Sequence, residues 1–260
     1  MKNGHANVVA GLFGVPGHVE VERGLAEFRG GRPVLFCDGG HTLVALPVDG
    51  IEADRLAAFR VLCTPLPPRL IVTARRARAL GIDAAGPMSL TLTPADDVDT
   101  IFSLAADVDI ERAVDAVPAA ATSASAAIEL AKLAQLMPAL LAVEAAGGPA
   151  ATMTALDPPL IAVSSAAVAG FRRSVVQSLS IAGQAQVPLQ GGIAARFVVF
   201  RDAVGGGSAA VIVGEPDFSQ TVPVRLHSAC LTGDVFGSRR CDCGDQLTLA
   251  LARLDAAGGG

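Results

Sequence analysis

The sequence lacks features that would define several classes of protein. It has no excess of positive charge, since 20 Lys and Arg residues stand against 25 Asp and Glu residues, whereas nucleic-acid binding depends on basic clusters that neutralise phosphates. Its longest uncharged stretch, residues 174–195, is interrupted by Gln, Pro and Gly, which argues against a membrane span. Gly, Pro and Glu also interrupt the apolar residues near the N-terminus, as a secretory signal would not. We therefore expect no nucleic-acid partner and no membrane association.

The sequence also has few charged residues and few cysteines. Only 17% of its 260 residues are charged and 51% are hydrophobic, so the chain can bury a sizeable core in two domains. The five cysteines are an odd number, and three of them fall within residues 230–243. This distribution favours a reduced cytoplasmic location with one metal site over a disulfide framework.

Alternating helical and strand patterns predict an α/β layered architecture with a domain boundary between residues 177 and 178. Asp109 is expected to cap a helix that runs to about Val117, and residues 180–192 are expected to be a connector rich in Gln, Gly and Pro. The second domain, residues 178–260, is expected to contain a β-hairpin, a metal loop and a helix. The expected elements of this domain are strands 193–201, 209–214 and 221–226 and a helix from Cys243 to about Gly258.

Three cysteines near the C-terminus form the most informative pattern. Thiolates suit zinc, and Cys241 and Cys243 can hold one ion to which a loop returns Cys230. Three sulfur ligands leave a tetrahedral ion one open position, where water would become acidic enough for catalysis. Two alternatives remain: His227 could close a purely structural zinc site, or the cysteines could be small buried hydrophobic residues without a metal.

Basic residues bracket this cysteine pattern. Arg225, Arg239 and Arg240 could balance a negative metal centre or bind a phosphate. The alternative is that they are solvated or form ion pairs with neighbouring carboxylates. Those carboxylates are Asp234, Asp242 and Asp245. The helix after Cys243 would hold the cysteine pair rigidly and place Gln246 near the site.

Residues 225–234 (RLHSACLTGD) and 236–247 (FGSRRCDCGDQL) closely resemble the signature of the GTP cyclohydrolase II family. The resemblance implies that Cys230, Cys241 and Cys243 hold one catalytic zinc ion per chain. It also implies a set of GTP-binding residues. These are Arg225, Leu226, His227, Ser228, Ala229 and Gln246. The family usually has Glu where this chain has Ala229, so any contact made by that carboxylate is missing.

The resemblance further implies a reaction and its partners. The family opens the imidazole ring of GTP for riboflavin biosynthesis and releases formate and pyrophosphate, with Mg²⁺ assisting at the triphosphate and a homodimer as the assembly. The family's catalytic residues, among them a Tyr, are expected beyond Gly260, and this sequence has no Tyr. We therefore expect an incomplete activity in this chain. The alternatives are a non-catalytic zinc and nucleotide-binding module or a zinc-stabilised scaffold.

Residues 21–38 and 125–139 resemble the opening and a late helix of 3,4-dihydroxy-2-butanone 4-phosphate synthase, which is often fused ahead of the cyclohydrolase. That enzyme needs an acidic metal-binding loop, but here Asp38 is followed by Gly-Gly-His-Thr. Its Gly-His-Thr-Glu element is also replaced, by residues 121–125 (ATSAS). Because clustered carboxylates are the usual ligands of magnesium, we expect residues 1–177 to be a catalytically silent synthase-like domain with a structural or dimerising role.

Overall fold

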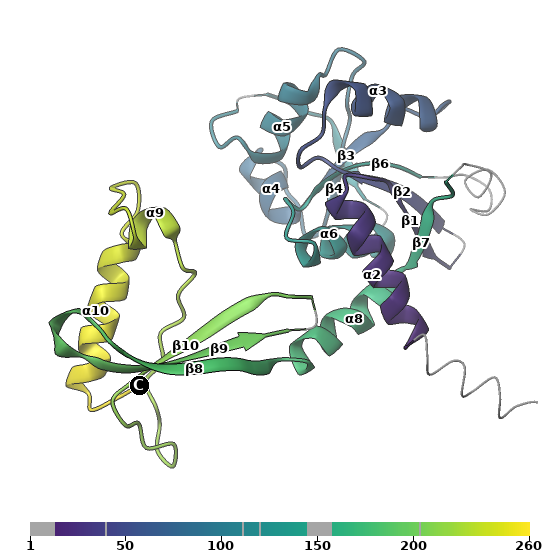
Figure 1. The fold of residues 1–260 in the computed structure, drawn as a ribbon. Coiled ribbons are helices and arrows are strands. Elements are labelled where there is room, and N and C mark those ends of the chain that lie inside the picture. The colour runs from purple at the N-terminus through teal and green to yellow at the C-terminus, as the bar shows by residue number, and fades with distance from the viewer. Residues whose placement is uncertain (1–13, 40, 111, 120, 145–157, 203) are drawn as a thin grey trace, which may run out of the picture. The chain divides into compact units, whose positions relative to one another are not determined.

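The computed structural model describes residues 14–260 apart from residues 40, 111, 120, 145–157 and 203 (Figure 1). The chain divides into two compact units, Met1–Ser174 and Val175–Gly260. Helices and strands occur in both units, which confirms the expected α/β class. The expected boundary at residues 177/178 and the identity of each domain stay predictions.

In the described part of the first unit, seven strands form one mixed sheet in the order β5-β4-β3-β6-β2-β1-β7. Every neighbouring pair is antiparallel except β1 and β7, which are parallel. The strands are β1 (Val34–Asp38), β2 (His41–Pro47), β3 (Arg69–Val72), β4 (Met88–Leu90), β5 (Ala116–Pro118), β6 (Ala139–Glu144) and β7 (Ile161–Ser164). The helices are α2 (Pro16–Arg29), α3 (Ala53–Leu62), α4 (Ala74–Ala79), α5 (Val98–Ala106), α6 (Ala121–Leu133) and α8 (Ser165–Gln177), whose last residues belong to the second unit.

Both faces of this sheet are covered because successive side chains of a strand point to opposite sides. Leu35, Val44 and Leu70 pack with side chains of α3 and α5 in the main core cluster. Phe36 points to the other face, where its ring meets that of Phe28 from α2 at a centroid distance of 5.9 Å. The apolar residues in the first half of the sequence thus form a core on both sides of one sheet, as the expected layered arrangement requires.

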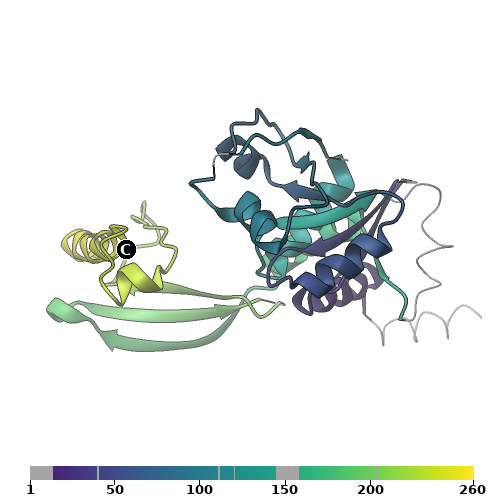
Figure 2. The same cartoon turned by 90° about the horizontal axis from the view of Figure 1, so that it is seen from above.

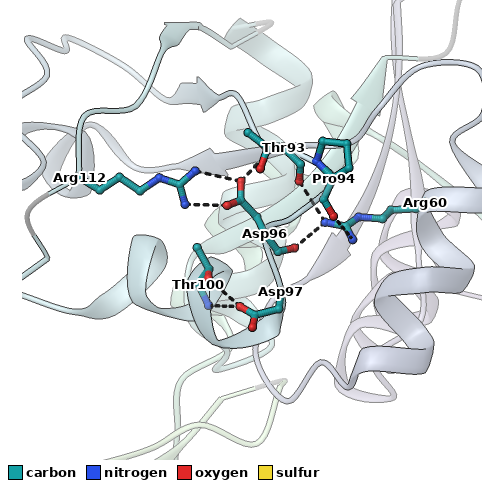
Figure 3. Close-up of polar contacts among 7 residues, drawn as sticks. All are labelled: Arg60, Thr93, Pro94, Asp96, Asp97, Thr100 and Arg112. Carbon is teal, nitrogen blue, oxygen red and sulfur yellow. Dashed lines mark hydrogen bonds and ion pairs between the residues drawn. The ribbon is translucent and has the colours of Figure 1, made fainter.

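A group of hydrogen-bonded polar residues precedes helix α5 (Figure 3). It explains why the helix expected from Asp109 does not form. Asp97 caps α5 by accepting a 2.9 Å hydrogen bond from the Thr100 amide, and the neighbouring Asp96 binds both terminal nitrogens of Arg112. The helix expected from Asp109 is wrong: the described residues between 109 and 115 are irregular, and β5 follows. Asp109 instead donates its amide to the Asp107 side chain, and Arg112 extends to Asp96, so both residues make polar contacts outside a helix.

The second unit contains a sheet and two helices (Figure 2). Among its described residues, three antiparallel strands lie in the order β10-β9-β8. Its elements are β8 (Ser180–Pro188), the short 3-10 turn η1 (Gln190–Gly192), β9 (Ala194–Arg201), β10 (Gly207–Val213), α9 (Leu231–Asp234) and α10 (Cys243–Ala256). Figure 2 shows α9 and α10 on one side of this sheet.

Two further expectations for this unit are wrong. The segment expected to be a connector is mostly strand β8, which pairs with β9 from Ser180 to Pro188 although nearly all its side chains are exposed. The strand expected at residues 221–226 is irregular, and Pro223 within it has no amide to donate to a ladder. The hairpin of β9 and β10 and the helix after Cys243 are confirmed.

No helix among the residues that the structure describes is both long and apolar enough to cross a membrane.

Candidate metal centre

The short helix α9 and the longer helix α10 bring the three cysteines together. Cys230 is the residue before α9, Cys243 is the first residue of α10, and Cys241 lies in the turn between them. The three sulfur atoms all lie within 4.8 Å of one another, and those of Cys230 and Cys241 are 3.8 Å apart. Zinc–sulfur bonds of about 2.3 Å at tetrahedral angles place two sulfurs about 3.8 Å apart. The spacing of this donor set therefore fits one zinc ion.

Gly233 shows how tightly the chain closes around the sulfurs. A Cβ atom at this position would lie 2.9 Å from the sulfur of Cys241, 2.9 Å from the Cβ of Cys243 and 3.4 Å from the sulfur of Cys230. Only glycine fits there, because real Cβ contacts are not so short. The backbone of α9 thus forms one wall of the cysteine cluster.

Hydrogen bonds within the cluster shift the pKa values of two of its thiols in opposite directions. The Thr232 hydroxyl, the Gly233 amide and the other two thiols lower the pKa of Cys230 to about 7. Hydrogen bonds with Cys241 and Cys230 raise the pKa of Cys243 to about 12. Binding a divalent metal requires thiolates and releases the protons. The cluster therefore offers three sulfur donors, and a metal ion that binds them would displace their protons.

His227, the alternative fourth ligand, forms a pair with Asp234. Its Nε2 lies 2.9 Å from Oδ2 of Asp234, and both side chains are largely buried, with exposed fractions of 15% and 13%. Among the described residues the group able to hold a metal consists of the three cysteines. The geometry thus leaves a fourth coordination position that no protein side chain in this group fills.

The residues expected to bind substrate lie in two places. Arg225 and Gln246 are hydrogen-bonded side chain to side chain and line a shallow cavity of about 260 Å³ with Val224, Leu249 and Arg253. Other lining residues are Pro223, Ala250 and Leu254. The remaining expected residues, Leu226, Ser228 and Ala229, lie on the exposed part of the loop that leads to Cys230. Ala229 has a φ of 51°, a left-handed conformation that is uncommon for Ala.

Sequence reasoning missed the roles of Thr232, Gly233 and Asp234. It treated Asp234 as a possible partner of the arginines, whereas the structure pairs it with His227. Arg239 and Arg240 are both exposed in the turn before Cys241. The signal that could have found Gly233 is its place between Cys230 and Cys241, where close approach of the backbone to clustered sulfurs favours glycine.

The fold and the cysteine cluster define a two-unit α/β protein with a centre suited to a metal ion in its second unit. Residues 180–260 match the family model of GTP cyclohydrolase II. The cysteine cluster lies wholly within this match. The resemblance expected from the sequence is therefore confirmed.

Similar proteins extend the comparison over both units. GTP cyclohydrolase-2 of Xylella fastidiosa (strain Temecula1 / ATCC 700964) is 34% identical over 257 residues, which cover 95% of this chain and 61% of that protein. GTP cyclohydrolase-2 of Azospirillum brasilense is 34% identical over 252 residues, which cover 92% of this chain and 65% of that protein. This chain thus spans less than two thirds of the length of these relatives.

A solved structure also aligns with the chain. It is the crystal structure of RibBX, a two domain 3,4-dihydroxy-2-butanone 4-phosphate synthase from A. baumannii, with a TM-score of 0.43 and 16% sequence identity over 87% of this chain and 79% of that one.

Proposed function

We propose that this chain carries the zinc-binding part of a GTP cyclohydrolase II, a hydrolase of riboflavin biosynthesis that opens the imidazole ring of GTP and releases formate and pyrophosphate. The observation that carries the proposal is the convergence of Cys230, Cys241 and Cys243 within the segment that matches the family. One zinc ion per chain is the expected cofactor, GTP is the expected substrate and Mg²⁺ is expected with its triphosphate. All five cysteines are free thiols, which supports the expected cytoplasmic location.

Bound zinc would supply Lewis acidity that lowers the pKa of water beside the purine. The residues of this chain have separate tasks. The guanidinium of Arg225 offers several donors in a planar fork, which suits the oxygens of a nucleotide. Gln246 accepts a hydrogen bond from Arg225 and donates one of 2.8 Å to Asp242. This chain of bonds from α10 orients Arg225 before a nucleotide arrives.

The role proposed for the first unit is structural. The strands β1 and β2 place Asp38 opposite His41, where the synthase family has its acidic loop. Among the described residues no other group of three His, Cys, Asp or Glu side chains besides the cysteine cluster is close enough to hold a metal. We propose that this synthase-like unit is catalytically silent and supports a homodimer.

Metal analysis of the purified protein tests the centre directly. We expect one equivalent of zinc per chain, lost in Cys241→Ser and retained in Cys37→Ser, a matched control in the first unit. A wild-type protein without zinc after purification and zinc addition would refute the proposed centre.

A non-catalytic zinc and nucleotide-binding module is the second candidate, and Ala229 motivates it because the family usually has Glu at this position. The two candidates differ in turnover. In a protein extended past Gly260 to the length of the relatives, formate released from GTP and lost in Cys241→Ser supports the hydrolase, whereas stoichiometric zinc and GTP binding without formate supports the module.

A further inference from the structure

Strand β8 forms one edge of the sheet in the second unit (Figure 1). It pairs with β9 on one side, and no strand among the described residues pairs with its other side. Nearly all its side chains are exposed, including that of Ile181 at 63%. The strand is therefore held by a single ladder of backbone hydrogen bonds, because burial of its side chains adds little.

This edge lacks the features that usually keep an edge strand from pairing with another chain, which are short length, charged side chains and proline. The edge strands of the first unit are short: β5 has three residues and ends at Pro118, and β7 has four. Strand β8 has nine residues (SIAGQAQVP), none of them charged, and its one proline is its last residue. At the opposite edge of the same sheet, the end of β10 is already paired, since Val213 exchanges hydrogen bonds with Gly260.

The register of β8 against β9 shows which backbone groups point outward. The amide of Leu189, just after β8, donates a 2.9 Å hydrogen bond to the carbonyl of Ile193. In an antiparallel pair, residues that bond to the partner strand alternate with residues that point away from it. The pairing continues without a shift from this point back to a bulge near the start of β8. The amides and carbonyls of Gln184 and Gln186 therefore point to the open edge.

We infer that β8 joins two copies of this chain by pairing antiparallel with β8 of the second copy. The two-fold axis passes through Ala185, so that Gln184 of each copy lies opposite Gln186 of the other. In this register the outward amides and carbonyls of the two glutamines bond to one another, and Pro188 and the bulge lie outside the central pairs. At the axis, Ala185 meets its own copy in a non-hydrogen-bonded pair, where side chains approach closely and a methyl group fits.

The chemistry of β8 favours a second copy as the occupant of this edge. A strand that pairs with its own copy brings like charges together if it carries any, and like charges directly opposite each other are destabilising. Residues 174–195, which include all of β8, carry no charge. The side-chain amides of Gln184 and Gln186 both donate and accept hydrogen bonds, so they complement each other across the axis. The inference rests on the homodimer of the proposed function and names a surface for it in the second unit, but it does not require bound zinc.

Charges placed on the two glutamines test both the contact and its register. Gln184→Lys/Gln186→Lys puts like charges opposite each other in both pairs and is expected to raise the dissociation constant of the dimer about tenfold or more. Gln184→Lys/Gln186→Glu puts opposite charges there and is expected to keep the constant within about threefold of the wild type. Sedimentation equilibrium over a series of protein concentrations measures the three constants. The two variants each carry two new charged residues, so a loss confined to the first is not an effect of folding.

A disulfide tests the position of the axis. Ala185→Cys is expected to form a covalent dimer under mild oxidation, because the Cα atoms of a non-hydrogen-bonded pair lie about 4.5 Å apart, within the range of a disulfide. Ser208→Cys, at an exposed position of β10, and the wild type with its five cysteines are the controls. Neither control is expected to form a covalent dimer.

Three results would overturn the inference and leave the rest of the proposed function in place. They are a Gln184→Lys/Gln186→Lys variant that dimerises as tightly as the wild type, a Gln184→Lys/Gln186→Glu variant that loses the dimer to the same extent, and an Ala185→Cys variant that cross-links no more than Ser208→Cys. A wild-type protein that stays monomeric would overturn the homodimer as well and leave this edge to a strand of another protein. Zinc content and formate release are measured separately, so a failure of the metal centre is distinguishable from a failure of this interface.

Discussion

Arg225 donates a hydrogen bond from its Nη2 to Oε1 of Gln246, and this contact joins the loop before Cys230 to the first turn of α10. The two residues flank the cysteine cluster in sequence, and both line the same cavity. The contact therefore links the proposed nucleotide-binding residues to the helix that begins with Cys243 of the proposed metal site.

Replacing Arg225 with Ala is expected to weaken GTP binding roughly 10- to 100-fold, because a hydrogen bond to a charged group contributes about 1.5–3 kcal/mol. Gln246→Ala is expected to cause a smaller loss, since it removes a neutral side chain that supports the guanidinium of Arg225. Isothermal titration with GTP measures both. Arg201→Ala, on an exposed position of β9, is the control and should bind as the wild type does; equal losses in Arg225→Ala and Arg201→Ala would contradict the assignment.

Replacing Gly233 with Ala is expected to weaken zinc binding by about tenfold or more, since an added methyl group in a packed site costs about 1–3 kcal/mol. The new Cβ would press on the sulfur of Cys241 and the Cβ of Cys243. Competition with a chromogenic zinc chelator measures the change. Gly207→Ala adds the same methyl group in open space on β10 and is expected to leave zinc affinity unchanged.

The ion pair of Asp96 and Arg112 is expected to stabilise the first unit in a pH-dependent way (Figure 3). The side chain of Asp96 is 6% exposed and contacts Arg112 at 2.7 Å. Hydrogen bonds from Arg112 hold the pKa of the Asp96 carboxyl below its ordinary value of 3.8, against the opposing effect of burial. Arg112→Ala is expected to lower the free energy of unfolding at pH 7 by about 1–3 kcal/mol, measured by urea denaturation.

The sign of the pH effect follows from the lowered pKa. The contribution of the pair is fully present above the unfolded-state pKa of Asp96 and is lost as the pH falls through the folded-state value. The difference between wild type and Arg112→Ala should therefore shrink below about pH 4. Arg32→Ala removes a more exposed ion pair with Glu27 and is expected to lower the free energy of unfolding less than Arg112→Ala does, because solvent screens an exposed pair. A difference in Arg112→Ala that persists unchanged at pH 2.5 would contradict this account.

Cys63 is expected to resist alkylation in the folded protein. Burial raises the pKa of its thiol to about 12, and the thiolate is the form that reacts. Mass spectrometry after treatment with iodoacetamide at pH 8 should find Cys63 unmodified without urea and modified in urea. Rapid modification of the native protein would show that the packing of α3 against the sheet is looser than described.

The cysteine cluster could be predicted from the sequence because its three residues are close along the chain. Cys230, Cys241 and Cys243 span only a short segment, and the chemistry of sulfur restricts what they can bind. The pairing of His227 with Asp234 could not be predicted, because it depends on how α9 turns the carboxylate back toward the preceding loop. Spacing alone left His227 as a candidate ligand.

The fold was predictable where side-chain patterns decide the local structure. The hairpin of β9 and β10 alternates around a glycine turn, and α10 follows a helical pattern. Strand β8 could not be predicted because its side chains are exposed and its stability comes from backbone pairing with β9. The irregular segment after Asp109 also escaped prediction, since Arg112 contacts Asp96, a residue outside any local window.

The end of α10 returns to the hairpin, where the amides and carbonyls of Val213 and Gly260 exchange hydrogen bonds of 2.9 and 3.1 Å. The segment that contains the cysteines is therefore a closed loop. Its two ends are joined by the hydrogen bonds between Val213 and Gly260, and its middle is held together by the cysteine cluster. Closing a loop costs conformational entropy. When metal binding joins the three sulfurs, the loop between Val213 and Gly260 is already smaller and its closure costs less entropy. A metal ion bound by the sulfurs should therefore slow hydrogen exchange at the amides of Val213 and Gly260. The exchange rate of these distant amides would report whether the cysteine cluster holds a metal.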